Sequence, residues 1–543
     1  MDNFRKRRHS QATNAKNSMK RTRSIDDVFT ASPSGKLVKK SKKSDKVSRI
    51  VKAEDAFKRA EGFTPRQRNV SKEMPDGTAL GRKKSDLVDE MKKKEKPKKK
   101  KFRSFLGGAT PLFLGLFLAF SGFVVGSIYL RTSNIFANGG SALALNDQID
   151  PNSLTGEGDG RVNFLLLGKG GPGHDGADLT DTVIVASLDP INDDVALLSI
   201  PRDFWVPVPG NGSMKINSVY ATYKQQAIYQ GSSDDDAEKA GIEAIENTVE
   251  SILGIKMNYY SMVDFKAFEK AINTVGGIEI DVKEQLYDPS IAWENNWDPL
   301  IADVGRQTFN GKTALLYARS RQTSARGDFD RADRQREVIV ALGEKVLTLG
   351  TFSNPIKMAQ LLDEFGSHVR TNISISDMTK IYDIANDFED RTVDSINLAG
   401  TTEEDSLVTT ANIGGLSVVI PVAGVGDFSE IQHFIRNQLK DGFIRKEDPK
   451  ILVLNGTSSV GLATEKEKEL KSFGYNVIGA TDAPTKNFSE TLFIDLTKGD
   501  KKYTKRYMEL RFKTEATEDL PNGIDPGGAD FVIILGRNAT TSF

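Results

Sequence analysis

Cysteine is absent from the 543 residues of this chain, and only four histidines and three tryptophans are present. The absence of thiols excludes disulfide bonds, thiolate metal sites and a cysteine nucleophile, and it leaves the redox compartment open. Neither an HExxH zinc motif nor a Ser-His-Asp order is present. Catalysis by these routes is therefore excluded, and any chemistry must come from other side chains.

The net charge is also zero, but this average hides a strong asymmetry. Residues 1–103 contain 33 of the 74 Lys and Arg but only 13 of the 74 Asp and Glu, so the remainder is acidic. Few aromatics, many Lys and Ser and no hydrophobic period predict a disordered tail over residues 1–104. We interpret the tail as a topology signal that associates with anionic lipid. Nucleic-acid binding is the alternative, and we expect no nucleic-acid partner.

A hydrophobic stretch over residues 105–130 separates the two parts and carries no charged side chain. About 20 apolar residues are enough for a helix to cross a bilayer. The stretch is too long for the apolar region of a signal peptide, so we predict a transmembrane helix. Lysines crowd its N-terminal side, whereas only Arg131 follows closely. Positive charge stays inside, which predicts a single-pass protein of the cell membrane with a cytoplasmic N-terminus and extracellular domains.

Beyond the hydrophobic stretch, the sequence predicts a linker and two folded domains. Residues 131–160 are rich in Asn, Ser and Gly, as linkers are. Short apolar runs such as Val162–Leu167 then alternate with segments of helical spacing such as Ala237–Leu253. This alternation predicts an α/β domain over residues 161–445, with a mixed central sheet flanked by helices. A similar but shorter pattern predicts a small α/β domain over residues 449–540.

The first predicted strand leads into a Gly-rich turn that carries several carboxylates. Asp175, Asp178 and Asp181 follow one another there. Such a turn can bring backbone N–H groups close to a phosphate, but it lacks the Gly-Lys-Ser/Thr of a Walker loop, and a solvent-exposed loop is the alternative. Asp181 stands at the mouth of an apolar strand, where a carboxylate can bind Mg²⁺; a turn-capping role is the alternative.

Arginines accumulate at two later positions. Arg202 and Asp203 follow a predicted strand, and strand ends are where open α/β sheets bind ligands. A local salt bridge is the alternative for this pair. Arg319 and Arg321 would project to one face of an extended segment, where two guanidiniums suit an anion between them.

A third group of charges follows directly in the sequence. Asp330 is predicted to cap a helix on which Arg331, Arg334 and Gln335 share one face. A solvated surface is the alternative for such a run. Taken together, the clusters predict a pyrophosphate site in which Arg side chains and a divalent metal neutralise the phosphoryl oxygens.

These residues lie in segments that resemble, in order, those of the LytR-CpsA-Psr proteins of bacterial cell envelopes. The resemblance runs from about residue 161 to 445. Its segments are Asn163–Gly168 (NFLLLG), Asp181–Val185 (DTVIV), Leu198–Asp203 (LSIPRD), Lys215–Tyr220 (KINSVY), Val275–Ile280 (VGGIEI), Phe309–Arg321 (FNGKTALLYARSR) and Gly327–Gln335 (GDFDRADRQ). Residues 449–540 resemble the C-terminal domain often attached to such proteins, through Val453–Ala463 and Gly528–Gly536.

The resemblance implies a phosphotransferase that moves a glycopolymer from a polyprenyl-pyrophosphate carrier onto peptidoglycan, assisted by Mg²⁺ or Mn²⁺. It implies that Asp181 binds the metal, with Asp175 as a candidate second ligand. The pyrophosphate would be held by Arg202, Lys215, Arg319 and Arg321. The catalytic site would be completed by Asp203, Arg331, Arg334 and Gln335.

Two positions depart from the family's pattern. The family usually has Gly-x-Asp after the first strand, where this chain has Lys169–Gly170, and an Arg two residues before the metal Asp, where this chain has Leu179. Asp175 or Asp178 is the candidate replacement for the carboxylate. Two alternatives therefore stay open: a polyprenyl-pyrophosphate hydrolase, and a non-catalytic wall-binding or scaffold protein.

Overall fold

This computed structural model describes residues 139–146, 148–322, 324, 326–348, 365–388, 393–400 and 404–540. The predicted basic tail, the transmembrane helix and the first part of the linker lie outside these ranges and stay predictions. Within the described ranges, no helix is both long and apolar enough to cross a membrane.

A six-stranded mixed sheet forms the centre of the larger core. In sheet order its strands are β11 (Val369–Thr371), β6 (Tyr259–Asp264), β1 (Val162–Lys169), β2 (Thr180–Asp189), β3 (Asp194–Ser199) and β12 (Val393–Asn397). Strand β1 runs parallel to β6 and antiparallel to β2, while β3 runs antiparallel to β2 and parallel to β12. The predicted mixed α/β sheet is therefore confirmed.

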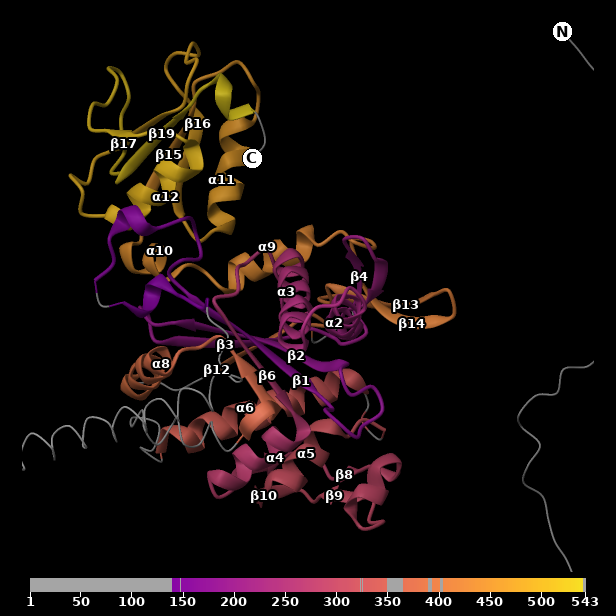
Figure 1. Cartoon of the computed structure of the whole chain (residues 1–543). Coiled ribbons are helices and arrows are strands. Elements are labelled where there is room, and N and C mark those ends of the chain that lie inside the picture. The colour runs from indigo at the N-terminus through magenta and orange to yellow at the C-terminus, as the bar shows by residue number, and fades with distance from the viewer. Residues whose placement is uncertain are drawn as a thin grey trace, which may run out of the picture. The chain divides into compact units, whose positions relative to one another are not determined.

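Side-chain alternation along β1 explains why both faces of this sheet are covered. Leu165 and Leu167 join one core, whereas Phe164 packs on the opposite face and stacks against Tyr259. The helices in the first core are α2 (Val219–Tyr229), α3 (Asp234–Leu253) and α9 (Ser429–Gln438). Figure 1 shows them on one side of the sheet, with α4, α5 and α6 on the other.

The helices on that second side form a core of their own with short strands. Its elements are α4 (Phe265–Thr274), β7 (Ile278–Val282), β8 (Leu286–Tyr287), η6 (Pro289–Asn295), β9 (Leu300–Ala302), β10 (Gly305–Phe309), α5 (Gly311–Arg319) and α6 (Asp328–Thr348). Strand β7 pairs with β10, and β8 pairs with β9, both antiparallel. This group of elements carries most of the predicted arginines.

Smaller elements complete the first part of the fold. They are β4 (Trp205–Val208), β5 (Gly212–Lys215), η5 (Ile216–Ser218), α8 (Ile375–Asp387), β13 (Val408–Ile413) and β14 (Leu416–Pro421). Strands β4 and β5 form a hairpin directly after β3, and β13 and β14 form another. The first hairpin turns the chain back so that Lys215 returns to the end of β3.

Two local predictions are wrong. The segment around Arg319 is not extended, because helix α5 continues to that residue behind an N-cap at Asn310, whose side chain accepts a hydrogen bond from the Thr313 N–H. Asp330 is not a cap, because α6 already begins at Asp328. Asp330 lies in the first turn of α6 and accepts from the backbone N–H of Arg326.

A second, five-stranded sheet follows the helix α10 (Gly442–Glu447). In sheet order its strands are β16 (Asn476–Asp482), β15 (Lys450–Asn455), β19 (Phe531–Leu535), β17 (Leu492–Asp495) and β18 (Ala516–Thr517), with helices α11 (Leu462–Ser472) and α12 (Lys502–Phe512). Every residue of β19 is buried, as expected for the central strand of a covered sheet.

A fully buried carboxylate, Asp441, ties this second sheet to the start of the first core. One oxygen accepts from the N–H groups of Gly158 and Gly160 and from the Tyr507 hydroxyl on α12. The other accepts from the N–H groups of residues 443 and 444 at the start of α10. Burial raises the pKa of Asp441, although these hydrogen bonds oppose the rise.

Candidate functional site

Arg202, just after β3, is the centre of a cluster of carboxylates. Its Nη1 lies 3.2 Å from Asp181 Oδ1, and its Nε lies 3.1 Å from Asp328 Oδ2 and 3.6 Å from Asp203 Oδ2. Burial acts to lower the pKa of Arg202, but the three carboxylates outweigh it and raise the pKa. The guanidinium is therefore a fixed positive charge that joins β2, the end of β3 and the start of α6.

Two further side chains complete the charge balance of this cluster. Lys215 Nζ lies 2.6 Å from Asp203 Oδ1, and Asn217 Nδ2 donates to Asp181 Oδ1 at 3.0 Å. Both come from the segment that follows the β4–β5 hairpin. Asp181 Oδ2 has no hydrogen-bond or ion-pair partner among the described residues, and the Asp181 side chain is 41% exposed. One carboxylate oxygen therefore stays available to a ligand.

Helix α6 brings the second group of predicted residues to Arg202. Arg331 Nη1 lies 3.2 Å from Asp328 Oδ1. Burial acts to raise the pKa of Asp328, but the charges of Arg331, Arg202 and Arg321 outweigh it, and the pKa is lowered. Arg336 fixes the helix against the sheet, because its Nη1 donates to Ser199 Oγ at the end of β3 at 2.7 Å.

Arg319, the last residue of α5, is held by a different set of neighbours. Its Nη1 lies 2.6 Å from Glu294 Oε2 on η6, and its guanidinium lies 4.5 Å from the centre of the Phe265 ring. The following turn is fixed by Asp288, whose Oδ2 accepts from Ser320 Oγ and from the Arg321 N–H, both at 2.9 Å. The segment that contains η6 therefore positions the end of α5.

Arg334 and Gln335 contact the backbone of α5 from the neighbouring helix. Arg334 Nε donates to the carbonyl oxygen of Tyr317 at 3.1 Å, and Arg334 Nη2 donates to that of Ser320. Gln335 Nε2 donates to the carbonyl oxygen of Ala318 at 3.3 Å. The last carbonyls of a helix have no intrahelical partner, so these bonds hold the C-terminus of α5 in place.

An apolar cavity of about 360 Å³ opens at this helix end. Its walls are mostly apolar, and they come from β1, β6, α4, α5, α6, β11 and the residue Phe365 before β11: Leu166, Val263, Phe265, Phe268, Ala271, Leu315, Ile339, Leu342, Phe365 and Val369. Polar side chains among its lining are Lys169, Thr182 on β2, Ser261, Asp264, Arg319 and Gln335. The cavity therefore combines an apolar interior with a few charged groups, as sites for amphipathic ligands do.

Strand β2 and helix α6 contribute side chains both to the cavity and to the Arg202 cluster. Thr182, which lines the cavity, follows Asp181 directly in β2. Arg321 stands two residues after Arg319 and is close enough to lower the pKa of Asp328. A ligand with an apolar tail and a pyrophosphate head could therefore occupy the cavity with its tail and face the arginines with its head.

Neither Lys169 nor Asp175 contacts the Arg202 cluster: Lys169 pairs with another carboxylate, and Asp175 is exposed. Lys169 Nζ pairs with Asp178 Oδ1 at 2.9 Å and lies 3.3 Å from the Tyr220 hydroxyl, and Lys224 pairs with the other Asp178 oxygen. Burial acts to raise the pKa of Asp178, but the two lysines lower it. Asp175 is exposed in the Gly-rich turn and makes no hydrogen bond or ion pair to any described residue.

Asp181 is the one predicted metal ligand that the structure places in the Arg202 cluster. No group of three or more His, Asp or Glu suited to a metal occurs among the described residues. Mg²⁺ is commonly bound by one or two carboxylates, with substrate phosphates and water completing its shell. The free oxygen of Asp181 meets that need for one ligand.

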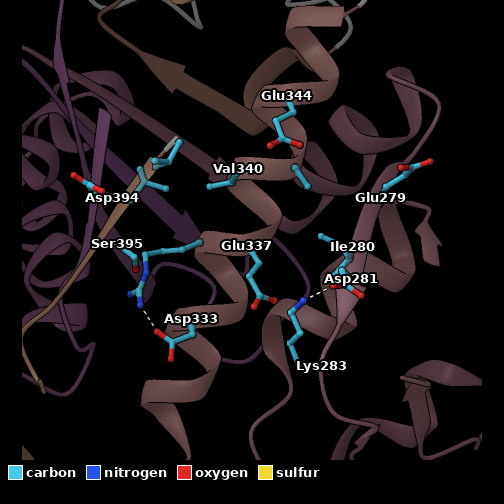
Figure 2. Close-up of a pocket in the computed structure, with 14 residues that line it drawn as sticks. Glu279, Ile280, Asp281, Lys283, Asp333, Glu337, Val340, Glu344, Asp394 and Ser395 are labelled. Atoms are coloured by element: carbon cyan, nitrogen blue, oxygen red, sulfur yellow. Dashed lines mark hydrogen bonds and ion pairs between the residues drawn. The ribbon is translucent and has the colours of Figure 1, made fainter. Parts of the chain in front are cut away.

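A second cavity, of about 540 Å³, has the opposite character. Figure 2 shows carboxylates around it from α6 (Asp333, Glu337 and Glu344) and from β7 (Glu279 and Asp281). Such a cavity repels a pyrophosphate, because like charges at close range are unfavourable. The apolar cavity is thus the better candidate for a phosphorylated lipid.

Several residues of the candidate site were not predicted from sequence. Glu294 and Asp288 lie in a segment with no recognisable motif, and their partners are 25 and 32 residues away. Asp264 lines the apolar cavity, caps α4 and lies 2.5 Å from His368 Nδ1. Asp328 could have been predicted from the sequence, because it begins a helix that carries three arginines.

The sequence matches the LytR_cpsA_psr family over residues 128–417, and a domain described as LytR cell envelope-related transcriptional attenuator over residues 448–538. TagV of Bacillus subtilis, named a polyisoprenyl-teichoic acid–peptidoglycan teichoic acid transferase, is 32% identical over 41% of this chain and 52% of TagV. TagU of Oceanobacillus iheyensis, which is named as the same kind of transferase, is 32% identical over 54% of this chain and 83% of TagU. LcpA of Corynebacterium glutamicum, a cell wall biosynthesis protein, is 27% identical over 60% of this chain and 62% of LcpA.

The chain thus spans about half the length of TagV and under two thirds of LcpA. Among solved structures, TagT bound to LIIa-WTA superposes with a TM-score of 0.41 at 22% identity, covering 56% of this chain and 98% of TagT. The crystal structure of B. subtilis TagV gives 0.38 at 26% identity, covering 51% of this chain and 97% of TagV. The family match extends over more than half of the chain. This chain therefore belongs to the LytR_cpsA_psr family.

Proposed function

We propose that this chain is a membrane-anchored phosphotransferase that moves a glycopolymer from a polyprenyl-pyrophosphate carrier to peptidoglycan. The observation that carries the proposal is the apolar cavity with Arg319 in its lining, next to the Arg202 cluster. The cavity suits a polyprenyl tail, since each buried CH₂ group contributes about 0.8 kcal/mol. TagV and TagU, which are named as transferases of teichoic acid to peptidoglycan, support the same reaction.

In this proposal Arg202, Arg319 and Arg321 bind the pyrophosphate, and Lys215 adds positive charge beside them. An acceptor hydroxyl forms a bond to the phosphorus that carries the glycopolymer, and the bond from that phosphorus to the bridging oxygen breaks. Polyprenyl phosphate leaves, and the hydroxyl proton is lost to solvent. Fixed guanidiniums stabilise the negative charge that develops on the phosphoryl oxygens, and their preorganisation lowers the barrier.

Other predicted residues have supporting roles in this scheme. Asp203 orients Lys215 and Arg202, and Arg331 orients Asp328, while Arg334 and Gln335 hold the helix end that bears Arg319. Asp181 would hold Mg²⁺ or Mn²⁺, which supplies Lewis-acid neutralisation of phosphate charge when bound. Asp175 stays a proposed second ligand without a contact that supports it.

The proposed arrangement of the chain follows the sequence. Residues 105–130 would anchor the protein as a single-pass helix, with the N-terminus in the cytoplasm and residues 161–445 and 449–540 outside. An anchor would keep the site near a carrier whose tail lies in the same bilayer. The partners would be the lipid-linked glycan and peptidoglycan, with no nucleic acid.

The proposal is tested with the full-length chain, a polyprenyl-pyrophosphate oligosaccharide, peptidoglycan and Mg²⁺. We expect a covalent conjugate, and Arg319→Ala should reduce its formation at least about 100-fold. Ala271→Leu fills part of the apolar cavity and should weaken binding of long-chain carriers more than that of a short-chain analogue. Ala341→Leu, which fills the acidic cavity instead, is the matched control.

Three outcomes would contradict the transferase, and a fourth would contradict the assignment of its site. Free phosphorylated sugar without conjugate would indicate a hydrolase. Carrier binding without any turnover, or the absence of carrier binding, would indicate a scaffold protein. Equal activity of Arg319→Ala and the wild type would show that the site is assigned to the wrong residues.

A further inference from the structure

The segment from β8 to the start of β10 exposes an unusual amount of aromatic surface. Trp293 and Trp297 are 60% and 81% exposed, although tryptophan is among the residues that gain most from burial. Tyr287 and Val304 in the same segment are also exposed. The chain has only three tryptophans, and two of them lie in this one segment. Exposed apolar groups gathered in one place indicate a contact surface.

The backbone of Trp297 has a conformation that bulky residues avoid. Asn296 and Trp297 have φ angles of 55° and 67°, in the left-handed region. Local hydrogen bonds fix the turn: the Trp297 N–H donates to the carbonyl oxygen of Ala292 at 2.8 Å, and Asn295 Nδ2 donates to that of Leu300 at 2.9 Å. A glycine would adopt these angles without strain, and such strain concentrates at ligand-binding positions.

The same segment is fastened to the end of α5, where Arg319 lies. Glu294, next to Trp293 in η6, binds the Arg319 guanidinium. Asp288 at the start of η6 binds Ser320 and the N–H of Arg321. A partner resting on the two tryptophans would therefore lie near Arg319, which lines the apolar cavity.

Charge decides which class of partner suits this surface. Within residues 286–305 the exposed charged side chains are Asp298 and Asp303, and this segment contains no Lys or Arg. An acidic surface is repelled by the anionic headgroups of a bacterial bilayer. A sugar chain has uncharged rings whose C–H faces stack on indole rings and whose hydroxyl groups bond to carboxylates and amides. The surface thus favours a glycan over a lipid headgroup layer.

We propose that Trp293 and Trp297 form a platform on which sugar rings of the acceptor glycan strand stack, beside the reacting phosphate. The inference rests on the proposed transferase function and assigns its acceptor side. The apolar cavity takes the donor's tail, Arg202, Arg319 and Arg321 take its pyrophosphate, and the two indole rings take the strand that supplies the hydroxyl.

Binding of neutral N-acetylglucosamine oligomers to the full-length chain tests this without any lipid substrate. Trp293→Ala and Trp297→Ala should each raise the Kd about tenfold or more. Tyr229→Ala is the matched control, because that ring is equally exposed on α2, and its Kd should stay at the wild-type value. Trp297→Gly should bind as poorly as Trp297→Ala and yet unfold at a higher temperature than Trp297→Ala, since glycine relieves the left-handed strain.

Tryptophan fluorescence separates a glycan surface from a membrane surface. The oligomers should shift the emission of the wild type to shorter wavelength, whereas vesicles of phosphatidylglycerol and phosphatidylethanolamine should not shift the emission attributable to these two residues. An unchanged Kd in both alanine variants, or a shift caused by vesicles alone, would overturn the inference. If the wild type forms conjugate while the variants keep its acceptor KM, the platform is wrong and the transferase stands. If the oligomers bind as expected but no conjugate forms, the platform stands and the transferase is wrong.

Discussion

The carboxylate of Glu294 forms an ion pair with the guanidinium of Arg319, with 2.6 Å between Oε2 and Nη1. The other oxygen of Glu294 is buried and has no hydrogen-bond partner among the described residues. Arg319 is thus the main partner of this carboxylate, and a phosphate that approaches Arg319 must compete with it. In the free protein Glu294 takes the position of an anion and neutralises a cation that would otherwise stand unpaired beside an apolar cavity.

Glu294→Gln should therefore tighten the binding of a polyprenyl pyrophosphate. Removing a competing charge from a partly buried pair contributes up to about 1 kcal/mol, which corresponds to a Kd lower by about fivefold. Binding is measured on the full-length chain by titration with the carrier. Glu279→Gln, at an exposed pair with Arg306, is the control and should leave the Kd unchanged. Weaker binding by Glu294→Gln would show that Glu294 serves mainly to orient Arg319.

Arg202→Ala should abolish most transfer, because three carboxylates would then face one another without their shared cation. We expect at least about a 100-fold loss of conjugate formation, with folding retained as judged by circular dichroism. Arg306→Ala removes an exposed guanidinium and should have wild-type activity. Arg202→Lys keeps the charge but not the bidentate geometry, so its activity should lie between those of the wild type and Arg202→Ala. Wild-type activity in Arg202→Ala would place the phosphate site elsewhere.

Asp288 gives an acid-sensitive contribution to stability. Burial acts to raise its pKa, but hydrogen bonds from Ser290, Ser320 and two backbone N–H groups outweigh it and lower the pKa to about 2. Since the folded pKa lies below the ordinary value of 3.8, this stabilisation is complete above about pH 4 and is lost as the pH falls toward 2. Asp288→Asn should unfold at a lower temperature at pH 7.

The difference in melting temperature between Asp288→Asn and the wild type should then shrink between about pH 4 and pH 2. Asp519→Asn is the control, since that carboxylate is exposed and accepts no hydrogen bond from any described residue. A constant difference at every pH would show that Asp288 stabilises the fold by shape alone.

Asp441→Asn should destabilise the protein by about 2–4 kcal/mol at neutral pH. Each oxygen of Asp441 accepts at least two hydrogen bonds, so the amide group of Asn must turn its own donors toward donors. Denaturant unfolding monitored by circular dichroism measures the loss. Loss of less than about 0.5 kcal/mol would contradict a structural role for this carboxylate.

The sequence supports the sheet and part of the site. Apolar runs predicted β1 and β3. Such a run also shows where its strand ends, and the end of β3 predicted Arg202 and Asp203 as site residues. Arg319 was placed in an extended segment because its short apolar run has no period long enough to distinguish helix from strand. The apolar cavity could not be predicted from the sequence, because seven elements from distant parts of the chain line it. Glu294 and Asp288 were missed for the same reason: their partners are set by tertiary packing.

The Asp441 carboxylate lies where the chain leading from residue 160 into β1 meets the chain leaving toward the second sheet. Consider a force that pulls the N-terminal side of the chain away from the second sheet. It would act on the hydrogen bonds between Asp441 and the N–H groups of Gly158 and Gly160 before it acts on β1, which starts after Gly160. The hydrogen bonds of Asp441 would then bear the force, and the six-stranded sheet, which contains Asp181 and borders Arg202, would not. Geometry at the arginines would stay constant while the two ends of the chain are drawn apart.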